Sequence, residues 1–113
     1  MMQNVKPIVV NDDESGMEYT LEFNREAVRF AEARGFKIQD VADFPMTKIP
    51  ELWFYAFRMH HKNVARAKTD ALLDGLGGIP DGLLERLGEL YAAPFEALTD
   101  GQTEENPRVT VRM

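Results

Sequence analysis

The acidic stretch NDDESGMEYTLE at residues 11–22 is the first place in the chain where side chains could bind a metal ion. Its oxygen-bearing residues follow the spacing of a calcium-binding loop, with Gly16 at the position of the turn glycine. These residues are Asn11, Asp13, Ser15 and Glu22. However, Asn11 stands where a carboxylate is required, Glu18 replaces an apolar residue, and the flanking segments have the pattern of strands. We therefore predict a solvated hairpin turn with no metal ion, and no cofactor.

Other residues of catalytic type also lack partners at a useful spacing. His60 and His61 are adjacent, so on a helix they point about 100° apart and cannot bind one metal ion together. Glu85 and Glu89 lie one helical turn apart, with no apolar cleft evident to raise the pKa of either carboxyl. The glycine-rich GLGG at residues 75–78 lacks the Lys-Ser/Thr ending of a phosphate-binding loop. We predict that the protein is not an enzyme.

The charge and apolar content of the chain argue against nucleic acid and membranes as partners. The chain has 113 residues, a formal net charge of −6 and no cysteine. The acidic balance argues against nucleic acid, since binding to phosphates requires clustered Lys and Arg. The N-terminal stretch lacks a signal peptide's apolar segment, and no run of eighteen apolar residues occurs, so no membrane partner is expected. The absence of cysteine fits a reducing compartment such as the cytoplasm.

The first part of the chain has the two-residue period of β-strands. The segment KPIVV is β-branched, NDDESG favours a turn, and MEYTLEF alternates, with its apolar side chains on one face. We predict a β-hairpin over residues 5–23. A lone hairpin is marginal in water, so its apolar face must pack on other elements.

Helical patterns fill residues 24–98. Asn24 is a good N-cap for a first helix, and Gly35 is a typical stop after Arg34. A short turn around 38–44 follows, and the next helix is predicted to begin near Pro50, a favoured first-turn residue, and to contain ELWFYAFRMHH at 51–61. Two further helices are expected, from Val64 to Leu76 and from Pro80 or Asp81 to about Leu98, the last kinked or split after Tyr91 by Pro94.

These elements predict a mostly α-helical α+β protein, with an N-terminal β-hairpin packed on a small bundle of about four helices. We place one globular domain at residues 1–100 and a linker with a C-terminal tail at 101–113. In the tail, RVTVRM alternates in the manner of a short strand, which could join the hairpin.

The run LWFYAF at residues 52–57 covers every direction around a helix axis. Ile49, Leu52, Trp53, Ala56 and His60 share one stripe, which should face the core. Phe54 points away from that stripe, and Tyr55 lies toward its flank. Either the helix is central and buried on both sides, or these aromatics form an exposed patch for assembly.

A partner surface is predicted from the second of these alternatives. Its apolar residues are Phe54, Tyr55 and Phe57, and its basic residues, which would steer an acidic segment, are Arg58, Lys62 and Arg66. The alternative for the basic residues is a solvated helix junction.

Residues 18–98 resemble the short tail assembly chaperones of long-tailed bacteriophages. The resemblance is carried by LEFN at 21–24, by RGF at 34–36, and by a following helix with Pro45, Lys48, Leu52, Phe54, Ala56 and Phe57 at matching positions. These motifs are caps, stops and core positions rather than catalytic groups.

The resemblance implies a non-enzymatic helper in the host cytoplasm. Proteins of that family bind the tape-measure protein, a long helical chain that otherwise aggregates, and help to recruit tail-tube subunits. A homo-oligomer is compatible with this role. The alternative is a structural virion adaptor, such as a connector or tail completion protein, that stays in the finished particle.

Overall fold

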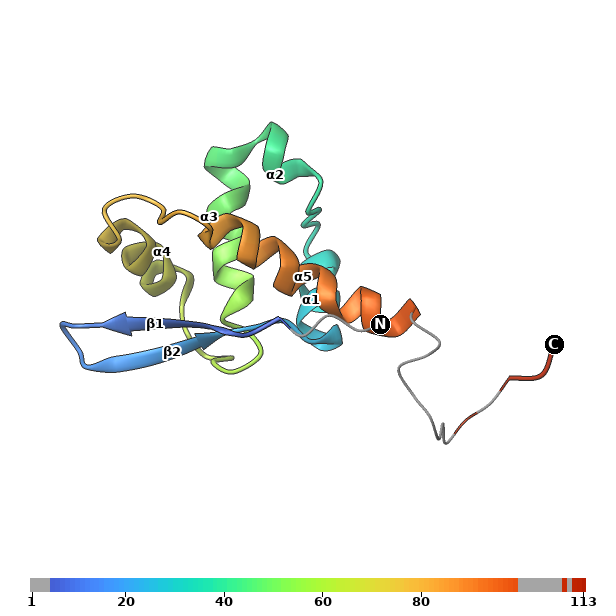
Figure 1. The fold of residues 1–113 in the computed structure, drawn as a ribbon. Helices are drawn as coiled ribbons and strands as arrows, with labels where there is room; N and C mark the ends of the chain where they lie inside the picture. Colours follow the sequence, from blue (N-terminus) through green and yellow to red (C-terminus); the bar gives the residue numbers. More distant parts are fainter. Residues whose placement is uncertain (1–4, 100–108, 110) are drawn as a thin grey trace.

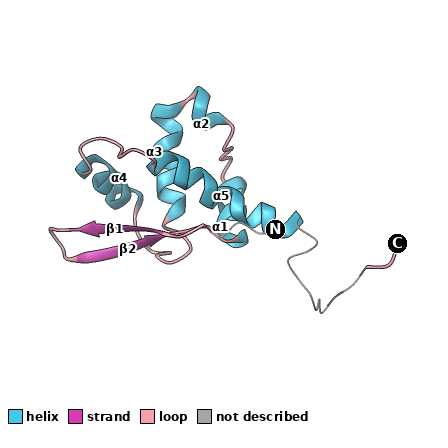
Figure 2. Cartoon of the chain, in the orientation of Figure 1, coloured by secondary structure: helices cyan, strands magenta, loops and turns pink. Residues whose placement is uncertain are grey.

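The computed structural model describes residues 5–99, 109 and 111–113. A two-stranded hairpin is followed by helices that pack on one of its faces (Figure 1, Figure 2). The elements are β1 (Ile8–Asp12), β2 (Met17–Leu21), α1 (Arg25–Ala33), α2 (Asp40–Asp43), α3 (Pro45–Ala56), α4 (Arg66–Gly75) and α5 (Leu83–Thr99). The predicted mostly helical α+β fold with an N-terminal hairpin is confirmed.

The hairpin is antiparallel and pairs Ile8 with Leu21 and Asp12 with Met17. Its turn is organised by Asp12, whose carboxylate accepts hydrogen bonds from Ser15 Oγ at 2.8 Å and from Lys68 Nζ of α4 at 2.7 Å. The bond from Lys68, assisted by Ser15, lowers the pKa of Asp12 below its usual value. The acidic turn is therefore tied to a helix through one carboxylate. Among the described residues, no cluster of metal-binding side chains is present.

The first helix has the predicted ends. Asn24 Oδ1 accepts the N–H of Ala27 at 2.8 Å, as an N-cap should. At the other end Gly35 has a φ of +89°, a conformation that side chains other than glycine's rarely adopt.

The helix that carries LWFYAF differs from its predicted bounds. It begins at Pro45 rather than near Pro50, because the carbonyl of Phe44 already accepts N–H groups from Thr47 and Lys48. Pro50 therefore lies inside α3 and removes one backbone hydrogen bond. The first turn around Met46 is exposed, so water can reach a carbonyl left free there. The helix also ends at Ala56, five residues before His61.

The last two helices agree more closely. α4 lies within the predicted 64–76 segment, and α5 begins three residues after Pro80. α5 continues through Pro94 to Thr99 as one helix, so of the predicted kink or split after Tyr91 the split is wrong. None of the helices in the described ranges combines the length and apolar character needed to cross a lipid bilayer.

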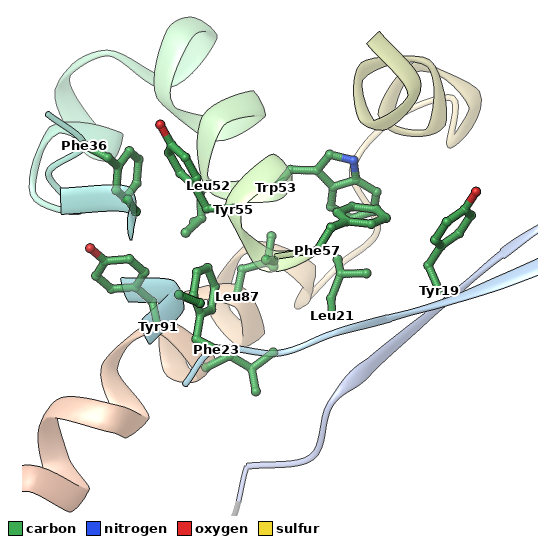
Figure 3. Packing of buried hydrophobic residues seen from close by; sticks show 14 of the residues in the cluster. Tyr19, Leu21, Phe23, Phe36, Leu52, Trp53, Tyr55, Phe57, Leu87 and Tyr91 are labelled. Atoms are coloured by element: carbon green, nitrogen blue, oxygen red, sulfur yellow. The ribbon is translucent and has the colours of Figure 1, made fainter. Parts of the chain in front are cut away.

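α3 is the central helix and contacts α1, α2, α4 and α5. The core beneath it is aromatic at both ends (Figure 3). At the hairpin end, the Phe57 ring packs edge-on against Tyr19 at 5.5 Å and Trp53 at 5.4 Å, measured between centroids. At the other end, Tyr91 packs against Phe23 and Phe36. Edge-to-face pairs of this kind stabilise the fold beyond the area that they bury.

The predicted tail lies mostly outside the described residues. Residues 101–108 and 110 are among those the structure does not describe. The described tail residues, 109 and 111–113, belong to no strand, and Val109 and Val111 are 82% and 78% exposed. Within the described ranges, the sheet therefore has two strands, and the predicted third strand is not formed by these residues.

Candidate functional site

An apolar groove lies between α1 and α5 and is also lined by the loop at residues 35–39. It encloses about 740 Å³. Phe36 and Tyr91 form its floor and belong to the core, whereas Phe95 and Leu98 stand at its rim with 66% and 57% of their surface exposed. A groove with an apolar floor and exposed apolar rim is typical of a surface that binds another chain.

The floor of the groove is positioned by the end of α1. The N–H of Phe36 donates to the carbonyl of Ala31 at 3.1 Å, and the N–H of Gly35 donates to that of Glu32 at 2.9 Å. These two bonds form a Schellman motif, which turns the chain back and packs the residue after the glycine against the helix. Phe36 is thereby brought to the floor, only 2% exposed.

The rim is formed by the last turns of α5. Because the helix continues through Pro94, Phe95 and Leu98 lie one turn apart, on the same side of α5 and beyond the core residue Tyr91. Both would be lost from the groove if the helix broke at the proline. The continuity of α5 is therefore what extends the groove.

The polar residues around the groove are mostly basic. Arg25, Arg29 and Lys37 line it, together with one acidic residue, Glu32. Burial, with smaller effects from Glu32 and Tyr55, raises the pKa of Tyr91 to about 12, so its hydroxyl stays protonated at neutral pH. The arrangement suits an apolar segment with acidic residues beside its apolar face.

A family model described as "Domain of unknown function (DUF5055)" matches residues 1–113. The chain belongs to the DUF5055 family. Comparisons with curated proteins and with solved structures found no match.

Two of the residues predicted to bind a partner are in the core. Tyr55 is 6% exposed and packs against Phe36, with ring centroids 5.4 Å apart, and Phe57 is fully buried. Neither side chain is therefore available to the predicted partner surface. The reason is that α3 is surrounded by other helices. Phe57, the C-cap of α3 with helical φ and ψ, lies one turn after the core residue Trp53 and therefore on the same side.

The other four predicted residues lie near the surface, where three of them line a cavity of about 50 Å³. Those three are Phe54, Arg58 and Lys62. The Arg58 guanidinium pairs with Glu26 at 3.2 Å and lies 3.8 Å from the centroid of the Phe30 ring. Arg66 pairs with Asp70 at 3.0 Å, and its guanidinium carbon is 5.8 Å from the Phe54 ring centroid.

These contacts explain the basic cluster without a partner. Cation–π contacts and ion pairs hold two of its arginines against the domain itself. A cavity of about 50 Å³ has room for solvent but not for a large apolar side chain. The groove between α1 and α5 is thus the better candidate site.

The two histidines have separate structural partners. His60 Nε2 lies 2.8 Å from Glu22 Oε1, and His61 Nε2 accepts the backbone N–H of Thr20 at 2.9 Å. His60 is exposed rather than in the predicted core stripe, because the α-helix has ended before it. Both residues connect the segment after α3 to the second strand.

Sequence reasoning missed the groove because its two walls are far apart in the chain. One signal was available: Phe95 and Leu98 follow the core positions Leu87, Leu90 and Tyr91 on the same helix, which is longer than the core requires. Phe95 and Leu98 are exposed because no other described segment of the domain packs over the end of α5. The sequence of α5 alone does not show how far that packing extends.

Proposed function

We propose that this DUF5055 domain is a non-enzymatic tail assembly chaperone of a long-tailed bacteriophage. It binds amphipathic helices of the tape-measure protein in the groove between α1 and α5, and it helps to recruit tail-tube subunits around that protein. The observation that supports this most is the groove itself, with its aromatic floor and exposed Phe95 and Leu98. The resemblance of residues 18–98 to tail assembly chaperones supplies the identity of the client.

The groove fits a helix in the mode by which amphipathic helices lie in apolar clefts. Such a helix presents apolar side chains about one turn apart, the spacing of Phe95 and Leu98 along the rim. Arg25, Arg29 and Lys37 would attract acidic residues that flank the apolar stripe of the client. Covering the stripe would keep a long helical chain from aggregating before the tail tube encloses it.

The test is co-expression of the tape-measure protein with the domain, followed by measurement of the soluble fraction and size-exclusion chromatography with light scattering. We expect Phe95→Glu and Leu98→Glu each to weaken the complex by about tenfold or more, since each loses the burial of a large apolar side chain. Both residues are exposed in the free domain, so the fold should persist.

Met46→Glu is the matched control. Met46 is 90% exposed and lies outside the groove, so this change adds the same charge without touching the proposed site. The proposal fails if the tape-measure protein stays insoluble with the unaltered domain, or if the groove variants behave like Met46→Glu.

The alternative, a structural virion adaptor, is separated from a chaperone by mass spectrometry of purified virions. A chaperone leaves the particle once the tube is assembled, so its peptides should be absent from finished tails. Peptides at a fixed stoichiometry with the tail proteins would favour the adaptor.

A further inference from the structure

The outer edge of β1 presents backbone groups that no described residue satisfies. In the hairpin, the N–H of Thr20 donates to His61 and the N–H of Glu22 donates to the carbonyl of Ala56. These two residues of the second strand and its extension therefore point their backbone groups away from β1. Along an antiparallel pair, the backbone N–H and carbonyl groups of successive residues point alternately toward and away from the partner strand. Val9 lies opposite Thr20, and Asn11 lies opposite Glu18. The backbone groups of Val9 and Asn11 therefore point away from β2.

The two edges of the sheet are thus unlike. The edge of β2 is covered by the end of α3 and by His61. The edge of β1 is bounded at one end by Arg86, whose Nη1 donates to the carbonyl of Lys6 at 3.3 Å, and is open along Val9 and Asn11. Within the described chain, no hydrogen bond reaches the outward N–H or carbonyl of either residue. An open strand edge is a template for another strand.

A cleft of about 630 Å³ runs beside this edge, between β1 and the loop that joins α4 to α5. Its apolar residues include Trp53, Leu76 and Leu83. Ile8 and Val10 of β1 face the helices, whereas Val9 faces solvent and is 53% exposed. A strand added to β1 would therefore place alternate side chains over Trp53 and Leu83 and the others in solvent.

The chain contains a segment with this pattern. Arg108–Met113 alternates apolar and polar residues, with Val109, Val111 and Met113 on one face. The described members of that face are exposed, at 82% for Val109, 78% for Val111 and 109% for Met113. In Figure 1 the end of the chain lies away from the hairpin of its own domain. The described residues of this face are therefore not covered by the sheet edge of their own domain.

Charge favours the same pairing. The segment carries two arginines and no acidic residue, in a chain whose net charge is −6. The hairpin turn next to the edge of β1 carries Asp13 and Glu14, both exposed. Arg108 would lie near this turn in an antiparallel arrangement and Arg112 in a parallel one, so either direction brings opposite charges together.

We propose that residues 108–113 of a second copy of this chain add to the open edge of β1 as a third strand. Val109, Val111 and Met113 then lie over the cleft, and the backbone groups of Val9 and Asn11 bond to the added strand. When two copies exchange segments reciprocally, they form a closed dimer. This pairing is independent of the groove between α1 and α5.

The experiment is sedimentation equilibrium of the whole chain from about 10 µM to about 1 mM, the range in which small interfaces dissociate. The unaltered chain should form dimers as concentration rises. Val9→Pro removes an N–H that points outward and leaves the ladder with β2 intact, as proline on a strand edge does. We expect it to weaken association by about fivefold to tenfold, and deletion of residues 108–113 to abolish association.

Val9→Thr, which keeps the outward N–H, is the matched control and should associate like the unaltered chain. Mixing provides a second test. The shortened chain retains its edge and the Val9→Pro chain retains its C-terminal segment. Mixing the two should therefore bring the shortened chain, which does not associate alone, into a one-to-one complex held by one added strand. Circular dichroism checks that each variant is folded, and the shortened chain tests the proposal even if Val9→Pro unfolds.

The proposal is overturned by any of three results. The unaltered chain stays monomeric up to the highest concentration, association survives deletion of residues 108–113, or the two variants fail to form a complex when mixed. A monomer in which the Val9 and Asn11 amides are nevertheless protected from hydrogen exchange would indicate that the segment covers its own edge, and would also reject exchange between copies.

Discussion

At the scale of single residues, His61 joins the segment after α3 to the hairpin through one hydrogen bond. Its Nε2 accepts the N–H of Thr20, so that nitrogen must be unprotonated while the bond exists. The ring is also packed edge-on against Tyr19, with centroids 5.1 Å apart. Burial, and then the neighbouring charge of His60, lowers the pKa of His61 below the ordinary value near 6.5. The neutral imidazole is therefore part of the folded state.

This arrangement predicts a loss of stability in weak acid. The native pKa of His61 is below its unfolded value, so the unfolded chain binds more protons and the free energy of unfolding falls as pH falls through about 6.5. The loss is complete once pH lies below the native pKa. Chemical unfolding measured between about pH 5 and pH 8 should show this slope.

His61→Gln is the matched variant, because an amide oxygen can still accept the Thr20 N–H but does not titrate. It should remove the part of the slope that His61 contributes. Identical pH profiles for the two proteins would show that His61 does not control the acid response.

At the scale of elements, α1 illustrates a helix whose ends are set locally. Asn24 accepts a hydrogen bond from the N–H of Ala27, and the left-handed Gly35 allows the chain to turn. Both depend on residues within one turn of the helix end. Such ends can be predicted from sequence, and they were.

Asn24→Ala should lower the free energy of unfolding by about 1 kcal/mol, because the N–H of Ala27 loses its acceptor. For a domain of this size that corresponds to a fall in Tm of about 4–8 °C. Thermal unfolding followed by circular dichroism measures it. Asn24→Asp keeps an acceptor at the cap and should stay close to the unaltered protein; if it falls as far as Asn24→Ala, the cap is not the cause.

α3 shows where local signals fail. Pro50 is an ideal first-turn residue, but Pro45 occupies that position, and Pro50 is accommodated inside the helix. At the other end no glycine or proline follows Ala56, yet the α-helix stops there. The last residue of α3 and the segment after it bond to β2 and the residue that follows it: the carbonyl of Ala56 accepts the N–H of Glu22 at 3.0 Å, and His61 accepts that of Thr20. A partner distant in sequence thus determines this end of α3.

At the scale of the whole molecule, Phe57 connects the hairpin to the helical core. It is fully buried between Tyr19 of β2 and Trp53 of α3, and the Trp53 indole N–H in turn donates to the carbonyl of Thr69 on α4 at 2.8 Å. One side chain therefore contacts both layers. Its neighbour Phe54 is half-buried at the edge of the same helix.

Phe57→Ala should lower the free energy of unfolding by about 3–5 kcal/mol, since a large cavity would open where three elements meet. Phe54→Ala, a change of the same size at a half-buried site, should cost clearly less. Urea unfolding of both variants checks this. Equal losses would mean that Phe54 is as much a part of the core as Phe57.

The sequence by itself determined the class of the fold and the ends set by local chemistry. The alternation in MEYTLEF, the cap at Asn24 and the glycine at 35 act over a few residues, so their effects can be read directly. The sequence also showed that the apolar side chains of LWFYAF surround the helix axis, so that one core-facing side cannot bury all of them. It left open whether the remaining side chains are covered by the core or by a partner.

Only the tertiary structure decided where that surface goes. Tyr55 and Phe57 are buried in the core, whereas Phe95 and Leu98 are exposed on a helix that extends past the core. Whether a side chain is covered depends on which distant segments pack beside it. That packing depends on contacts between segments from all parts of the chain, so it cannot be predicted from a local sequence pattern.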